Sequence, residues 1–317
     1  MMSNEKFPLV CVVGPTASGK TGLAAALSQR LDGEVVSADS MQIYQGLSIG
    51  TAKPTKEEMG GIPHHMIDFL SPKERFSVAD YAAMARRVIF DIHERGRLPV
   101  MAGGTGLYVQ AVTEGIVFQE EPENPEVRRQ LEQRAKEEGI EALFQELQRI
   151  DPPSAIRIDP GNEKRVIRAL EIYYLTGETM TRRLETSRPK DLPFRPVLIG
   201  LNFADRQKLY GRIEERVDQM MADGLLEEAE AVLHHLGITA SGAIGYKEFI
   251  PYFQGQITLE EAVEQLKRDT RRYAKRQLTW FKRDERIHWI LADREEGADG
   301  ILQNSLAYLK KEGIIGK

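Results

Sequence analysis

Apolar residues in the first half of the chain alternate between short continuous runs and helical spacings. The runs at Pro8 to Val13, Glu34 to Ala38 and Leu98 to Ala102 predict buried strands. The segment from Thr21 to Leu31 has a leucine at every fourth position, which predicts a helix between the first two strands. Strands that are apolar on both faces and alternate with helices are typical of a parallel sheet covered on both sides. We therefore expect an α/β core.

The pattern changes after Gly115, where helical spacing continues but strand signals become scarce. We expect a helical insertion domain over residues 116–195, between the two parts of the core, 1–115 and 196–317. Its entry, from Glu120 to Pro125, is polar and contains prolines. The elements expected in this half are helices at Pro125 to Gly139 and Asn162 to Thr176, a strand at Pro196 to Leu201, and long helices at Leu209 to Leu233 and Leu259 to Lys282.

Composition narrows the class of protein. A chain of 317 residues with 41% hydrophobic and 29% charged residues can bury a sizeable core and is neither disordered nor collagen-like. Its apolar runs are far shorter than the roughly 18 residues that would cross a bilayer. The single cysteine, Cys11, cannot form an internal disulfide, so we expect a buried thiol in a cytoplasmic protein. No pattern predicts an oligomer, and we expect a monomer.

A phosphate-binding loop follows the first predicted strand. It satisfies the pattern G-x-x-x-x-G-K-[ST] between a strand and a helix, so its backbone N–H groups, the helix N-terminus and the lysine can bind a phosphate chain. The last hydroxyl can ligate Mg²⁺. No acid follows the strand at Leu98 to Ala102, where an ATPase normally carries an aspartate. The predicted diphosphate or triphosphate site consists of Gly14, Pro15, Thr16, Ala17, Ser18, Gly19, Lys20 and Thr21.

Three further residues are candidates for this site. Asp39 follows the second strand, at the edge where parallel sheets bind ligands, and could act as a general base, ligate a metal through water, or only cap backbone N–H groups. Thr105 lies in a glycine-rich turn after the third strand and could donate its hydroxyl to a ligand, unless the turn is merely tight. Arg216 lies on the apolar face of its helix, so it should meet a buried carboxylate or an anionic ligand.

Two clusters of basic residues occur on a chain whose net charge is −5. From Lys267 to Arg283 the only acid is Asp269, and the basic residues lie opposite an apolar stripe. Such a surface is typical of contact with a phosphate backbone, although it could also be a solvated face without a partner. The clusters are Arg268, Arg272, Lys275, Arg276 and Arg283, and, in the insertion, Lys164, Arg165, Arg168, Arg182, Arg183 and Arg188.

Short motifs occur in a fixed order along nearly the whole chain. They are the phosphate loop, Asp39-Ser40-Met41-Gln42-Ile43-Tyr44, Gly50-Thr51-Ala52-Lys53-Pro54, Pro63-His64-His65, Gly103-Gly104-Thr105-Gly106-Leu107-Tyr108, Arg168-Ala169-Leu170-Glu171, Ile244-Gly245-Tyr246-Lys247, Ala274-Lys275-Arg276-Gln277 and Thr279-Trp280-Phe281. This ordered set resembles the tRNA dimethylallyltransferase (tRNA isopentenyltransferase) family. With one cysteine and no Cys/His zinc finger, the chain is similar to the bacterial branch.

The resemblance implies transfer of a dimethylallyl group from dimethylallyl diphosphate to N6 of the adenosine just 3′ of the anticodon, with release of diphosphate and use of Mg²⁺. It implies that Asp39 is the general base, that Thr21 lies near Mg²⁺, and that Thr105 and Arg216 hold the diphosphate. It also implies that the insertion grips the anticodon stem-loop of tRNA. The tRNA contacts it implies are Asp39, Ser40, Met41, Gln42, Thr105, Arg128, Lys164, Arg165, Val166, Ile167, Arg168, Gly242, Ala243, Ile244, Gly245, Tyr246 and Lys247.

Three other classes of function stay open on the residues alone. An adenylate isopentenyltransferase would prenylate free AMP without tRNA. A P-loop kinase would consume ATP in the presence of a hydroxyl acceptor. An RNA-binding module whose P-loop senses nucleotides would bind tRNA without changing its nucleosides.

Overall fold

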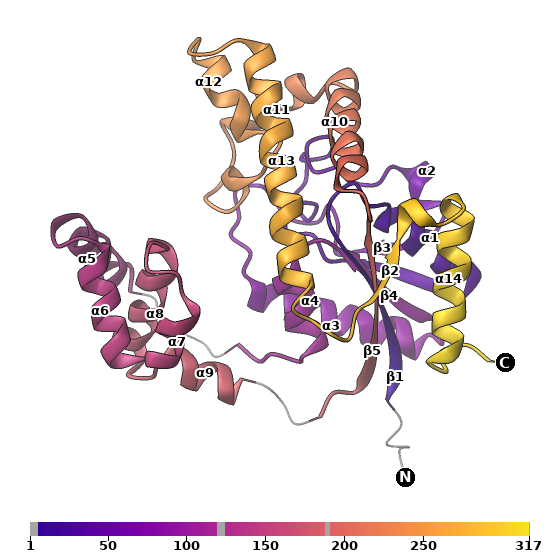
Figure 1. The fold of residues 1–317 in the computed structure, drawn as a ribbon, viewed down its shortest axis with the longest axis horizontal. Helices are drawn as coiled ribbons and strands as arrows, with labels where there is room; N and C mark the ends of the chain where they lie inside the picture. The colour runs from indigo at the N-terminus through magenta and orange to yellow at the C-terminus, as the bar shows by residue number, and fades with distance from the viewer. Residues whose placement is uncertain (1–5, 119–123, 188–190, 317) are drawn as a thin grey trace. The chain divides into compact units, whose positions relative to one another are not determined.

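The computed structural model describes residues 6–118, 124–187 and 191–316. The chain divides into two compact units, one made of Met1–Thr113 with Leu192–Lys317 and the other of Glu114–Asp191 (Figure 1). Most of the predicted polar entry to the insertion, and Arg188 of the second basic cluster, lie outside the described residues. None of the helices in the described ranges is both long and apolar enough to span a bilayer.

The first unit is built on a parallel sheet, which confirms the predicted α/β fold. Its strand order is β3-β2-β4-β1-β5-β6, and every pairing is parallel. The sequence predicted β1, β2, β4 and β5 but missed the two edge strands, of which β3 has two residues and β6 only one buried position. The strands are β1 (Phe7–Val13), β2 (Gly33–Ser37), β3 (His64–His65), β4 (Leu98–Gly103), β5 (Phe194–Asn202) and β6 (His288–Leu291).

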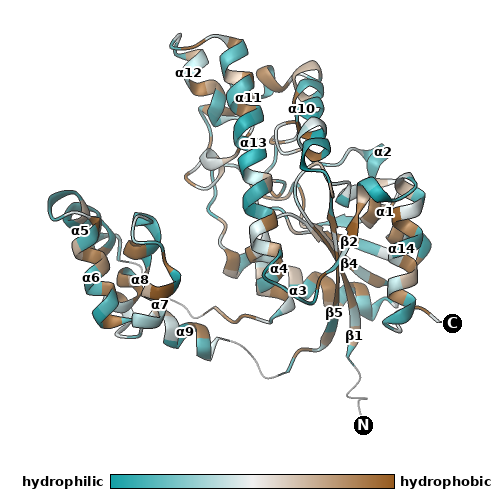
Figure 2. Ribbon diagram, viewed as in Figure 1, coloured by the Kyte–Doolittle hydropathy of each residue, from teal (hydrophilic) through white to brown (hydrophobic). Residues whose placement is uncertain are grey.

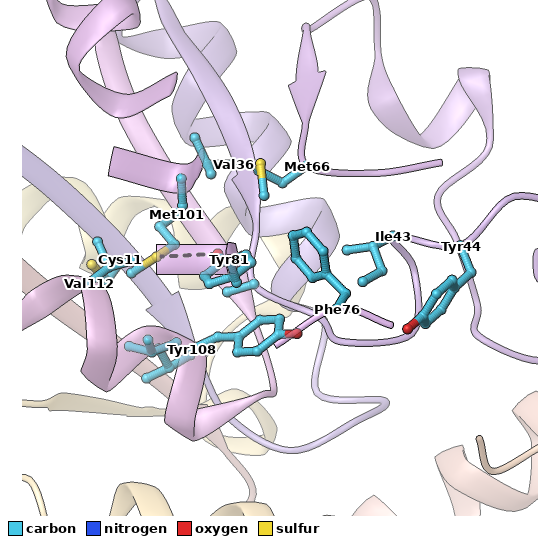
Figure 3. Close-up of a cluster of buried hydrophobic side chains, with 14 of the residues drawn as sticks. Cys11, Val36, Ile43, Tyr44, Met66, Phe76, Tyr81, Met101, Tyr108 and Val112 are labelled. Carbon is cyan, nitrogen blue, oxygen red and sulfur yellow. Dashed lines mark hydrogen bonds between the residues drawn. The ribbon is translucent and has the colours of Figure 1, made fainter. Parts of the chain in front are cut away.

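Burial of both faces of the central strand β1 explains why the sequence pattern predicted the sheet. Leu9, Cys11 and Val13 belong to one apolar cluster, and Val10 and Val12 belong to another, so both faces of the strand are covered. Figure 3 shows part of the larger cluster, in which Tyr81 and Tyr108 pack near Cys11. Cys11 is fully buried, as predicted, and burial raises the pKa of its thiol far above the usual range.

Helices cover both faces of this sheet. Leucines of α1 and α14 pack on one face, and α3 and α4 pack on the other (Figure 1), while the strands between them are mostly brown in Figure 2. The helices of eight or more residues in this unit are α1 (Lys20–Arg30), α3 (Val78–Glu94), α4 (Gly106–Thr113), α10 (Arg206–Ala222), α11 (Leu225–Leu233), α13 (Leu259–Phe281) and α14 (Gly297–Lys311); α2 (Lys56–Met59) and α12 (Ile250–Phe253) are single turns.

One helix prediction in this unit was wrong. The sequence predicted a single helix from Leu209 to Leu233, but α10 ends at Ala222 and α11 begins at Leu225. Gly224 causes the break, because its φ of 98° lies in the left-handed region, which a helix interior does not admit. Because of this break, α11 is a separate helix and does not continue α10.

Helices are the only regular elements in the described residues of the second unit, which has its own apolar core. The two predicted helices are confirmed within two residues at each end, and the second is closed by Gly177 with a φ of 73°. The core includes Leu143, Leu147 and Val166. The helices are α5 (Pro125–Glu137), α6 (Ile140–Ile150), α7 (Pro152–Arg157), α8 (Glu163–Thr176) and α9 (Met180–Thr186).

Candidate active site

A cavity of about 280 Å³ lies in the first unit at the carboxyl ends of β1, β2 and β4. This is the edge at which parallel α/β sheets bind ligands. The cavity is walled by the phosphate loop, by the turn after β2, by α10 and α13, and by two irregular segments. The predicted site residues among those lining it are Thr16, Ala17, Lys20, Thr21, Asp39, Ser40, Met41, Gln42, Arg216, Gly242, Ala243, Ile244 and Lys247.

The phosphate loop encloses the ammonium group of Lys20. Lys20 Nζ donates to the carbonyl oxygen of Pro15 at 2.5 Å. Burial lowers the pKa of Lys20 to about 7, the nearby Arg216 guanidinium also acts to lower it, and Asp39 opposes both. An anion bound in the loop would supply the counter-charge that favours protonated Lys20.

Gln277 ties the phosphate loop to the turn after β4. Its Oε1 accepts from the N–H of Thr16 at 2.8 Å, and its Nε2 donates to the carbonyl oxygen of Gly104 at 3.0 Å. A Cβ atom at Gly104 would collide with that amide, so only glycine fits there. Sequence reasoning placed Gln277 on an apolar stripe and missed its role; a lone amide on such a stripe was the available signal.

The Asp39 carboxylate has one of the roles considered from the sequence, the capping of backbone N–H groups. Its Oδ1 accepts from the backbone N–H groups of Met41 at 2.9 Å and Gln42 at 3.4 Å, which caps the turn after β2. Its Oδ2 has no hydrogen-bond partner among the described residues. One oxygen therefore fixes the turn while the other remains available to the half-buried cavity.

Thr105 lies behind this turn and does not line the cavity. Its Oγ1 accepts from the N–H of Ser40 at 3.0 Å and lies 3.4 Å from the Ser40 hydroxyl. Its own N–H donates to the carbonyl oxygen of Ala38 at 3.1 Å. Thr105 therefore holds the segment that carries Asp39.

Arg216 extends from α10 into the cavity. Its Nη1 lies 3.5 Å from the Oγ1 of Thr16. No carboxylate in the described parts of the chain forms an ion pair with it, and burial lowers the pKa of its guanidinium. Of the two partners expected from the sequence, a carboxylate and an anionic ligand, the geometry favours the ligand.

Apolar side chains line the cavity beside these charges. Ile213, Val217 and Met220 lie on the same face of α10 as Arg216, and Leu266 faces them from α13. The cavity thus offers cations for a phosphate chain and an apolar surface for a hydrocarbon group.

The carboxylate of Glu228 on α11 joins two segments of the cavity wall. It accepts from the N–H groups of Ser48 at 3.1 Å, Ile49 at 2.9 Å and Gly50 at 3.0 Å. It also accepts from the hydroxyl of Tyr246 at 2.7 Å, and the buried ring of Tyr246 lies against Gly50. Neither Gly245 nor Tyr246 lines the cavity. Glu228 was not predicted, because nothing in the sequence shows that α11 meets these loops.

In the second unit, two of the predicted tRNA-contacting arginines share one acid. Arg128 binds the Glu171 carboxylate through two hydrogen bonds of 2.9 and 2.8 Å, and Arg168 binds it at 2.8 Å. These arginines lower the pKa of Glu171, which is only 6% exposed. The acid therefore fixes the direction of both guanidinium groups.

The rest of the predicted tRNA-contacting segment in this unit contains both exposed and buried side chains. Lys164 and Arg165 are exposed, whereas the side chains of Val166 and Ile167 are buried in the core of the unit. Contact between RNA and this segment would therefore involve the cations and not these apolar side chains.

No group of three or more His, Cys, Asp or Glu side chains within residues 6–118, 124–187 and 191–316 could hold a metal ion. Thr21 does line the cavity. A metal here would depend on oxygen atoms of a bound phosphate chain as well as on the protein.

Comparison with known proteins gives one family. The IPP transferase family matches residues 42–284. A tRNA dimethylallyltransferase of Bacillus subtilis is 48% identical over 91% of this chain and 92% of its own, and one of Caldanaerobacter subterraneus is 46% identical over 95% and 97%.

Solved structures that are similar to this chain lead to the same family. The tRNA isopentenylpyrophosphate transferase of Bacillus halodurans has a TM-score of 0.72 and 45% identity over 96% of both chains. A eukaryotic dimethylallyltransferase acting on tRNA has a TM-score of 0.82 and 27% identity, over 98% of this chain and 81% of that one.

Proposed function

The chain belongs to the IPP transferase family, and on that premise we propose that it is a tRNA dimethylallyltransferase. It transfers the dimethylallyl group of dimethylallyl diphosphate to N6 of the adenosine just 3′ of the anticodon and releases diphosphate. The observation that carries this function is a cavity in which Lys20 and Arg216 lack a carboxylate ion pair among the described residues and lie beside an apolar wall. Since the substrate is tRNA, we place the reaction in the cytoplasm.

The reaction is a displacement at C1 of the dimethylallyl group. The N6 amine forms a bond to C1, the C1–O bond breaks, and its electron pair leaves with the diphosphate. Lys20, Arg216 and the N–H groups of the phosphate loop stabilise the charge that develops on the leaving group. The free Oδ2 of Asp39 accepts the proton that N6 loses, while Oδ1 keeps the carboxylate in place.

Mg²⁺ suits this site as a cation held through the substrate. The Thr21 hydroxyl and the diphosphate oxygens would hold it, in keeping with the absence of an acidic cage in the described ranges. When bound, it neutralises charge on the diphosphate.

The second unit binds the anticodon stem-loop in this proposal. Lys164 and Arg165 are exposed for backbone phosphates, and Glu171 orients Arg128 and Arg168. Because a base stacked in the loop cannot reach a half-buried carboxylate, the target adenine is flipped out of the stack.

The test is incubation of the purified protein with unmodified tRNA, dimethylallyl diphosphate and Mg²⁺, followed by digestion and mass spectrometry of the nucleosides. Prenylated adenosine is expected. Prenylation of free AMP in the absence of tRNA would instead favour an adenylate isopentenyltransferase. Transfer of phosphate from ATP to a hydroxyl acceptor, with unchanged tRNA, would favour a kinase.

A further inference from the structure

A second hollow lies between α10 and α13, which run side by side (Figure 1). We call it the α10–α13 groove; its volume is about 100 Å³, and it shares no lining residue with the cavity among the described residues. Leu209 and Leu278, which line the groove, pack in one small apolar cluster with Ala17 and Ile213, which line the cavity. The groove is therefore a distinct site that rests on the same two helices.

Cations dominate the lining of the groove. Arg206, Lys275 and Lys282 line it and are exposed, and none forms an ion pair within the described ranges of the chain. The guanidinium of Arg206 lies 6.0 Å from the centre of the Tyr210 ring. Of the residues that the structure describes, no carboxylate lines the groove, whereas Tyr210 and Thr279 do.

Three cations in the part of α13 from Leu259 to Arg272 have acidic partners. Lys267 pairs with Asp218 of α10 at 2.6 Å, and Arg271 pairs with Glu214 of α10 at 2.5 Å. Arg272 pairs with Asp269 at 3.2 Å.

The part of α13 from Tyr273 to Phe281 has no such acidic partners among the residues that the structure describes. Where it passes the first turns of α10, the facing residues are Arg206 and Tyr210 instead of acids. A solvated helix face usually interleaves both signs of charge, as α13 does before Tyr273. The cations from Lys275 onward are thus arranged for a partner outside the chain.

We propose that the α10–α13 groove binds a backbone phosphate of tRNA, at a contact separate from the catalytic cavity. This inference rests on the proposed function, which supplies tRNA as the substrate. Three cations around a small hollow suit the oxygens of one phosphodiester, and such contacts position RNA without reading its sequence.

The test is a double variant, Lys275→Gln with Lys282→Gln, assayed for prenylation between about 50 and 200 mM salt. We expect the KM for tRNA to rise about tenfold at the lower salt and by a smaller factor at the higher salt. The slope of log KM against log salt should fall by roughly 0.7 to 0.9 for each RNA phosphate that the variant no longer neutralises. The kcat at saturating tRNA and the KM for dimethylallyl diphosphate should not change.

The matched control is Arg268→Gln with Arg272→Gln, which removes the same charge from the part of α13 before Tyr273. It should change the salt slope little, because Arg272 already has an acidic partner. An unchanged slope in the Lys275 and Lys282 variant, or an equal effect in the control, would overturn the proposal. A raised KM for dimethylallyl diphosphate with normal tRNA dependence would also overturn it, since the groove would then serve a small anion. Failure of the unsubstituted protein to prenylate tRNA would count against the proposed function instead.

Discussion

The cations of the cavity in the first unit and the arginine pair of the second unit differ in whether a carboxylate pairs with them. In the cavity, Lys20 and Arg216 lie in a half-buried setting without a carboxylate ion pair among the described residues. In the second unit, Arg128 and Arg168 both bind the buried carboxylate of Glu171. A cation that the protein leaves without an acid is arranged to receive a small anion, whereas a cation held by an acid is oriented in advance for a larger partner.

The largest effect that would test this comparison is expected at Asp39, the one carboxylate among the described residues that line the cavity. Asp39→Asn keeps an oxygen that can accept from Met41, so the turn should survive, but the side chain can no longer accept a proton. We expect kcat to fall by about 10²–10⁴, with little change in tRNA affinity, as measured by single-turnover prenylation and RNA binding. Unchanged turnover would remove Asp39 as the base.

Arg216→Gln should have the next largest effect. Removal of one cation from the leaving group is expected to lower kcat/KM for dimethylallyl diphosphate by about 10²–10³. Steady-state kinetics at saturating tRNA would measure this decrease. Lys208→Gln, at an exposed position on the same helix, is the control and should retain nearly full activity.

Glu228→Gln tests a carboxylate that holds backbone instead of a cation. The new amide nitrogen cannot accept from Ser48 and Ile49 or from Gly50 and Tyr246, so at least one set of donors is left without its acceptor. We expect stability to fall by about 1–3 kcal/mol and kcat to fall about tenfold through misplacement of the cavity wall. Thermal unfolding and kinetics would show both effects.

Glu227→Gln is the matched control, because Glu227 is the exposed neighbour of Glu228 on α11. If both variants behaved alike, the contacts of Glu228 would have no special importance for the cavity.

Glu171→Gln should give the smallest effect, confined to tRNA. Without the carboxylate, Arg128 and Arg168 are deprived of their common anchor, and the KM for tRNA should rise several-fold while that for dimethylallyl diphosphate is unchanged. Glu126→Gln is the control, since Glu126 is exposed and pairs with the neighbouring Arg129.

The Glu171→Gln variant also tests how the stability of the protein depends on pH. The native pKa of Glu171 is lowered, so the unfolded chain binds more protons at acid pH and the stabilisation from this ion pair disappears as pH falls below the ordinary glutamate range. The difference in unfolding free energy between the wild type and Glu171→Gln should be full at pH 7 and shrink on acidification. A difference that stayed constant down to acid pH would contradict this account.

The sequence predicted the features that depend on near neighbours along the chain. The buried strands, the phosphate loop and the position of Asp39 at a strand end all follow from local patterns and from the topology of parallel sheets. The same holds for the helices that end at Thr176 and Phe281.

Features that depend on distant contacts were not predictable. Glu228 lies 178 residues from Gly50, and Gln277 lies 261 residues from Thr16, so no local pattern connects either pair. The break at Gly224 was missed because helical spacing continues on both sides of it. The short edge strands β3 and β6 carry too few buried residues to produce a strand pattern.

The second unit has a hydrogen bond that joins its two ends: the N–H of Val117 donates to the carbonyl oxygen of Ser187 at 2.8 Å. Its chain therefore enters and leaves at neighbouring points, although 70 residues of sequence separate them. A segment whose two ends lie close together can be exchanged as a whole between related proteins. The unit could be replaced by that of a relative with different tRNA preferences, and the chimaera would keep its prenyl chemistry while its choice of tRNA changed.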